Sequence, residues 1–141
     1  MNIYLDFDGT VVEHDYPQIG SLNPNSLEVI KKLQDAGHNI ILNSMRVEFD
    51  DGSMQEAIDF INLNKSIAGI KIQRQTEQKI YPPRWTLDKI ENDIFIDDIA
   101  PNIPLIKALV VGGLMVDWVE IEKQLRQKGI LDKDYDVAKI S

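Results

Sequence analysis

The stretch YLDFDGT, at residues 4–10, ends a short apolar run with two aspartates, Asp6 and Asp8. In an extended segment, side chains two positions apart lie on one face, so these carboxylates are neighbours while Phe7 points away. Like charges this close raise each other's pKa and destabilise the site unless a cation or a proton offsets them. We therefore expect a partner between the two carboxylates, and the rest of the chain can be searched for it.

Length and composition favour one globular domain that spans residues 1–141 and is large enough to bury a core. The chain has no cysteine, which excludes disulfides, thiolate metal sites and a cysteine nucleophile. Its formal net charge of −8 disfavours broad binding to nucleic acid or to an anionic membrane. No stretch is typical of a signal peptide or of a membrane span, so we expect a soluble cytoplasmic protein.

Apolar runs and helical patterns alternate along the chain. Four runs have the length and composition of buried parallel strands, namely NIYLDF (2–7), HNIILNS (38–44), NDIFIDD (92–98) and KALVVGG (107–113). SIAGIKI (66–72) is a candidate edge strand. Helical spacing predicts helices within 23–38, where Asn23 is a candidate N-cap, and within 53–64 and 117–129. This alternation predicts a three-layer α/β/α sandwich with a mostly parallel sheet, a Rossmann-like fold.

Polar residues follow three of these predicted strands at their carboxyl ends. Because ligands bind at that edge of a parallel sheet, we expect these residues to form one site. They are Asp6 and Asp8 after the first strand, Asn43, Ser44 and Arg46 after the second, and Asp97 and Asp98 after a later one.

The chemistry of this set suits a hard cation and a phosphoryl group. Carboxylates without histidine or cysteine partners favour oxygen-bound Mg²⁺. A hydroxyl such as that of Ser44 can donate to a phosphoryl oxygen, while a metal and a lysine neutralise its charge. One carboxylate can then attack phosphorus while its neighbour handles the proton of the leaving group.

These residues resemble the signatures of the haloacid dehalogenase (HAD) superfamily of phosphohydrolases. DFDGT (6–10) resembles the first signature, IILNS ending at Ser44 the second, and IFIDD ending at Asp97 and Asp98 the fourth. The third is a lone lysine upstream of the fourth, for which Lys89 is the best candidate, with Lys79 and Lys71 behind it.

The resemblance implies a role for each matched residue. Asp6 would be the nucleophile that forms an aspartyl-phosphate, and Asp8 the general acid and base. Asp6, the backbone carbonyl of Asp8 and Asp98 would hold Mg²⁺, with Asp97 as the alternative metal ligand or as a residue that orients the lysine. Ser44 and the lysine would contact the transferring group. Candidates for substrate contacts are Gly9, Thr10 and Arg46, although a surface ion pair is an equal reading of Arg46.

The short segments between the signatures leave no room for a large cap domain, so the resemblance is to the capless or minimally capped type. Such an open site admits a large substrate, or a lid from a partner subunit in a homodimer. A phosphorylated small molecule is the expected substrate, with a phosphorylated nucleic-acid end or a phosphoprotein as alternatives.

Two other functions compete with a phosphatase. A receiver-type signalling module also surrounds Mg²⁺ with acids, a serine and a lysine, but its phospho-acceptor aspartate ends a middle strand, where this chain has Asn43 and Ser44. A phosphoryl-binding regulatory protein without turnover is the third reading. Each acid that turnover needs is present, which favours the enzyme.

Overall fold

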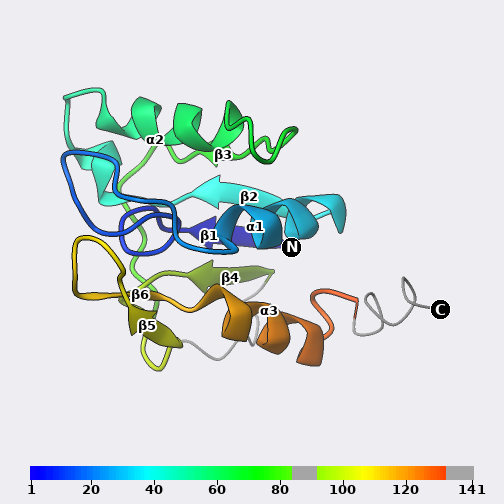
Figure 1. Ribbon diagram of the computed structural model, residues 1–141. Coiled ribbons are helices and arrows are strands. Elements are labelled where there is room, and N and C mark those ends of the chain that lie inside the picture. The colour runs from blue at the N-terminus through cyan, green and yellow to red at the C-terminus, as the bar shows by residue number, and fades with distance from the viewer. Residues whose placement is uncertain (84–91, 133–141) are drawn as a thin grey trace.

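A computed structural model describes residues 1–83 and 92–132, which contain a parallel sheet flanked by helices (Figure 1). The sheet is formed by β1 (Asn2–Leu5), β2 (Asn39–Leu42), β3 (Gln73–Arg74) and β4 (Asp93–Ile96), in the order β3-β2-β1-β4. All three pairings in this sheet are parallel. The predicted α/β class with a mostly parallel, Rossmann-like sheet is therefore confirmed.

In the described ranges, three α-helices of similar length accompany the sheet: α1 (Ser26–Asp35), α2 (Ser53–Asn62) and α3 (Trp118–Gln127). Each buries an apolar stripe at helical spacing, and these stripes form one hydrophobic cluster with the buried side of the sheet. The α1 and α2 helices connect successive parallel strands, so right-handed crossovers place them on the same face. An edge-to-face contact between Phe7, after β1, and Phe60 of α2 supports this placement.

The two faces of the sheet differ in burial. Ile3 and Leu5 of β1 are fully buried, as are their counterparts Leu42 and Ile96. Tyr4, Ile41 and Phe95 point to the other face and are only half-buried, with the rings of Tyr4 and Phe95 stacked at 5.1 Å. The apolar composition of these runs predicts parallel strands that are buried on both faces, whereas the structure buries them fully on one. The alternation arises because the helices that the structure describes share the first face.

The prediction of a parallel strand at KALVVGG was wrong. This segment forms the turn of an antiparallel hairpin between β5 (Leu105–Lys107) and β6 (Leu114–Val116). Gly112 and Gly113 take positive φ angles of 96° and 80°, which reverses the chain and leaves the apolar residues 109–111 exposed. Apolar composition alone did not distinguish a hairpin turn from a buried strand.

Two smaller predictions also need correction. SIAGIKI (66–72) is not a strand, and β3 begins only at Gln73. Asn23 does not cap α1, because its side-chain amide donates instead to the backbone carbonyls of Thr10 and Val116. Asn25, in a left-handed conformation, immediately precedes the helix. Across the described ranges, no helix is both long enough and apolar enough to cross a membrane.

Candidate functional site

The register of the sheet places the polar residues that follow β1, β2 and β4 side by side. Leu5 pairs with Leu42 on one side and with Ile96 on the other, so β1, β2 and β4 end level with one another. Hydrogen bonds continue one residue further, from Asn43 N to Leu5 O at 2.7 Å and from Asp6 N to Ile96 O at 2.9 Å. The predicted convergence of polar groups at the carboxyl edge is therefore a consequence of strand register.

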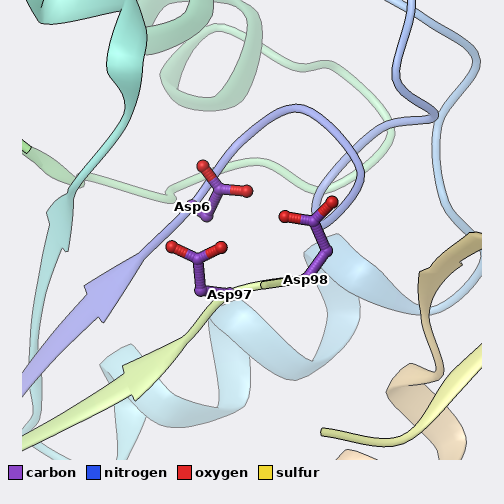
Figure 2. Close-up of side chains that lie close together, drawn as sticks. All are labelled: Asp6, Asp97 and Asp98. Atoms are coloured by element: carbon purple, nitrogen blue, oxygen red, sulfur yellow. The ribbon is translucent and has the colours of Figure 1, made fainter. Parts of the chain in front are cut away.

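Three carboxylates converge at this edge (Figure 2). Asp6 follows β1, and Asp97 and Asp98 follow β4. One oxygen from each lies within 4.8 Å of the others, with Asp6 and Asp97 buried and Asp98 half-buried. Asp8 does not join this cluster, although its side chain was expected to lie beside that of Asp6. The chain turns after Phe7, whose carbonyl accepts hydrogen bonds from the amides of Thr10 and Val11, so the extended geometry does not continue.

Thr10 and Gly9 join the ends of β1 and β4. The Thr10 hydroxyl donates to Asp6 Oδ2 at 3.0 Å and accepts from the amide of Asp98 at 3.1 Å. Gly9 has a φ of 80°, and a Cβ on this residue would overlap the carboxylate of Asp98. Both residues therefore set the position of Asp98 relative to Asp6. We had proposed them only as substrate contacts.

Among the residues that the structure describes, Lys79 is the lysine that contacts these acids. Its Nζ donates to Asp6 Oδ1 at 3.2 Å and lies 3.0 Å from Asp97 Oδ2. The second contact is an ion pair without hydrogen-bond geometry, which leaves Asp97 Oδ2 buried and without a hydrogen bond among the described residues. Lys89, the first choice from sequence, lies outside the described residues, and Lys71 is exposed.

Asn43 explains how Lys79 reaches the site from an irregular segment. The Asn43 side chain donates to the carbonyl of Ile80 at 2.7 Å and accepts from its amide at 2.8 Å. Asn43 is fully buried, so this pair of bonds fixes the backbone next to Lys79 against the end of β2. The sequence placed Asn43 at the edge but gave no indication of this partner.

Burial dominates the electrostatics of the carboxylate cluster. The pKa of Asp6 is raised well above its ordinary value by burial and by the charge of Asp97, although Lys79 opposes the shift. Burial likewise raises the pKa of Asp97 to about 6, again against the effect of Lys79. For Lys79, burial lowers the pKa, but the two carboxylates outweigh it and the net pKa is raised. One ammonium therefore compensates the cluster incompletely.

Asp8 has a cationic partner of its own. Arg46 donates to Asp8 from Nε at 2.8 Å and from Nη2 at 2.7 Å. The Arg46 side chain is 1% exposed and that of Asp8 12%, so this is a buried ion pair and not the surface pair considered above. The guanidinium carbon lies 5.1 Å from the ring centroid of Phe7 and 5.0 Å from that of Tyr16. Each aspartate of DFDGT thus has a separate cation beside it.

These groups line a cavity of about 230 Å³ at the carboxyl edge. Asp6, Asp8, Ser44, Lys79 and Asp98 all contribute to its lining. The Ser44 hydroxyl accepts from the amide of Arg46 at 3.2 Å and caps the short helix η1 (Met45–Glu48). Since Ser44 acts only as the acceptor in this bond, its own O–H can donate into the cavity.

Sequence reasoning missed the outer part of this cavity. Tyr16, Met45, Phe49 and Ile99 also line it. No periodic pattern marks these residues, because Met45 lies in the one-turn helix η1 and the others lie in turns and bends whose course depends on tertiary contacts. The identification of an apolar residue as a wall of a site requires the fold.

The donor set fits a hard divalent cation. Asp6, Asp97 and Asp98 supply only oxygen ligands, as Mg²⁺ prefers. Within the described part of the chain, Asp97 has a buried oxygen without a hydrogen bond, and three carboxylates face a single ammonium, which leaves negative charge that a divalent ion can offset. The residues present are therefore compatible with Mg²⁺.

Comparisons with known proteins give one structural relative and no family. No protein-family model matches the chain, and no curated protein matches it. A solved structure of a conserved protein from Bacteroides thetaiotaomicron is similar, with 29% sequence identity and a TM-score of 0.59 over 91% of each chain. The chain therefore shares its α/β fold over nearly its full length with that bacterial protein.

Proposed function

We propose that this protein is a Mg²⁺-dependent phosphomonoester hydrolase of the HAD type that works through an aspartyl-phosphate on Asp6. The observation that carries the proposal is the environment of Asp6. This residue lines the cavity, and its two carboxylate oxygens accept hydrogen bonds from Lys79 and Thr10. A carboxylate held by a lysine and a hydroxyl, with room in front of it, is suited to nucleophilic attack on phosphorus.

The reaction takes place in two displacements. A carboxylate oxygen of Asp6 forms a bond to phosphorus, and the bond from phosphorus to the ester oxygen breaks. Asp8, protonated at the start of this step, gives its proton to that oxygen and becomes the carboxylate that pairs with Arg46. Water then attacks the phosphorus of the aspartyl-phosphate and gives its proton to Asp8. The bond between Asp6 and phosphorus breaks, and inorganic phosphate leaves.

The remaining residues bind and orient. Lys79 holds Asp6 and places positive charge beside the incoming phosphoryl oxygens, and the Ser44 hydroxyl donates to one of them. Arg46 keeps the Asp8 carboxylate at the cavity wall by two hydrogen bonds. Asp6, Asp98 and the backbone carbonyl of Asp8 would hold Mg²⁺, with Asp97 beside them. When bound, the ion supplies the positive charge that neutralises the phosphoryl oxygens and keeps the clustered carboxylates ionised.

Hydrolysis of an aryl phosphate, with Mg²⁺ or with a chelator, tests this function in wild type and in Asp6→Asn. We expect metal-dependent turnover that is lost in Asp6→Asn and retained in Asp59→Asn, a matched change at an exposed position of α2. Trapping of a phosphorylated wild-type chain that Asp6→Asn does not form would identify the nucleophile. Equal turnover by Asp6→Asn would contradict the mechanism.

A further inference from the structure

The cavity at the carboxyl edge has a polar floor and an apolar rim. We define the floor by the buried lining residues Asp6, Ser44 and Lys79. The rim consists of the more exposed apolar and aromatic lining residues Tyr16, Met45, Phe49 and Ile99. The two parts offer different chemistry to a ligand that enters the cavity.

The rim is unusual because its apolar side chains gather at one opening. Met45 is 45% exposed, Phe49 44% and Ile99 52%. The rings of Phe49 and Tyr16 lie 5.4 Å apart, so they form part of one wall. Single exposed apolar residues are ordinary on a protein surface, but a group of them around a polar floor is the composition of a ligand pocket. The rim is therefore suited to an apolar part of the ligand.

The charges of the lining limit how many anionic groups the ligand carries. Three lining carboxylates, Asp6, Asp8 and Asp98, face the cations Lys79 and Arg46, and each of these cations is already paired with an aspartate. His14 and Tyr16 are the other titratable residues among the lining residues that the structure describes. A divalent ion and one phosphoryl dianion bring this set close to balance, whereas a second phosphate or a carboxylate would find no unpaired lysine or arginine among the lining residues that the structure describes.

We infer that the substrate is the monophosphate ester of a small neutral alcohol that carries a flat apolar ring, with the ring against Phe49 and Met45. This inference rests on the proposed function and specifies its substrate class. A volume of about 230 Å³ is below the usual range for drug-sized ligands, about 300–1,000 Å³, and suits a phosphoryl group with a single ring. Nucleoside di- and triphosphates exceed this volume and carry more negative charge than the described lining balances.

The test compares 2-phenylethyl phosphate with ethyl phosphate and with a sugar phosphate, in the presence of Mg²⁺. All three are esters of aliphatic alcohols, so the ring is the main difference between the first two. We expect kcat/KM to be about tenfold or more higher for 2-phenylethyl phosphate, as the burial of one ring provides. Equal kcat/KM for 2-phenylethyl phosphate and ethyl phosphate would overturn the inference and leave the phosphatase function intact.

Substitutions in the rim test where the ring of the substrate binds. Phe49→Ala and Met45→Ala should each lower the preference for the ring ester severalfold, mainly through KM. Leu63→Ala is the matched control, because Leu63 is 73% exposed at the end of α2 and does not line the cavity. Thermal unfolding checks that each variant folds. A preference that survives both rim changes would contradict the position assigned to the ring.

A binding measurement separates this inference from the proposed function. Calorimetry with 2-phenylethylphosphonate and ethylphosphonate, which cannot be hydrolysed, reports the ring subsite without turnover. We expect the ring compound to bind about tenfold more tightly, and equal affinities would overturn the inference. If no ester is turned over and no phosphorylated chain forms, the proposed function fails, whereas the two phosphonates still decide whether the rim selects a ring.

Discussion

Arg46 holds Asp8 through two hydrogen bonds of 2.8 and 2.7 Å while its guanidinium lies over the rings of Phe7 and Tyr16. The same guanidinium also donates to the backbone carbonyls of Gln18 and Ser53. Burial lowers the pKa of Arg46, but the hydrogen bonds and the charge of Asp8 outweigh it, so the net pKa is raised. Arg46, in the segment after β2, therefore connects the loop that contains Gln18, the start of α2 and the proposed general acid.

Replacement of Arg46 by lysine should reduce both activity and stability, since an ammonium cannot reproduce the planar pair of bonds to Asp8. We expect Arg46→Lys to lower kcat about tenfold or more, and Arg46→Met to cost about 3–5 kcal/mol in the free energy of unfolding, as for a buried pair that loses one partner. Chemical denaturation and steady-state kinetics measure these effects. Arg74→Lys, at an exposed position, is the control and should change neither quantity.

The lysine of the site provides a second prediction. Lys79 contacts Asp6 and Asp97, whereas the order of the signatures favoured Lys89. We expect Lys79→Met to lower kcat/KM by about 100-fold or more, because it removes the ammonium beside the phosphoryl oxygens. Lys89→Met should retain most of the activity. A loss confined to Lys89→Met would show that Lys79 is a structural ion pair only.

The elements that the sequence predicted well are those whose signals are local. Apolar runs located β1, β2 and β4, and helical spacing located α1, α2 and α3 to within a few residues. Since parallel strands share an edge, the convergence of Asp6, Asn43 and Asp97 followed from the same signals. Local periodicity is sufficient to identify these parts because burial on one face imposes it.

The rest depends on contacts between distant segments, which leave no period in the sequence. Lys79 reaches the site because Asn43, more than thirty residues earlier, binds the backbone of Ile80. Asp8 turns to Arg46 because the chain bends after Phe7. In KALVVGG the apolar residues suggested burial, but the two glycines produce a turn that exposes them. Such features require the tertiary structure.

The carboxylate cluster makes stability depend on pH. The pKa of Asp97 is raised in the folded chain from 3.8 to about 6, chiefly by burial. A group with a raised folded pKa stabilises the fold below its unfolded pKa, and this contribution is lost as the pH rises through the folded pKa. Without metal, the ionisation of Asp97 should therefore lower the free energy of unfolding by on the order of 2–3 kcal/mol as the pH rises from about 4 to about 7.

Mg²⁺ should compete with these protons. We expect the rise in Tm on addition of Mg²⁺ to be small at pH 5, where Asp97 is largely protonated, and larger at pH 8, where it is ionised. Thermal unfolding at both pH values, with Mg²⁺ and with EDTA, measures the difference. Asp97→Asn should weaken the pH dependence of the EDTA-treated protein. An equal Mg²⁺ shift at both pH values would argue against binding of the ion by this cluster.

Gly9 provides the last prediction, because its φ of 80° and the proximity of Asp98 exclude a side chain for separate reasons. In Gly9→Ala, the strained φ alone costs on the order of 1 kcal/mol, and the overlap of the new Cβ with the carboxylate must displace Asp98. We expect weaker Mg²⁺ binding and a loss of activity that a higher Mg²⁺ concentration partly restores.

Gly52→Ala is the matched control for this change. Gly52 has a φ of 79°, but nothing lies near the position of its Cβ. Gly52→Ala should therefore lower Tm to a similar extent through backbone strain while leaving the Mg²⁺ dependence of turnover unaltered. If both variants change the Mg²⁺ requirement equally, the effect arises from backbone strain. The space that Gly9 leaves for the Asp98 carboxylate would then not matter for metal binding. A Mg²⁺ requirement that increases only in Gly9→Ala would connect this glycine to the metal through Asp98.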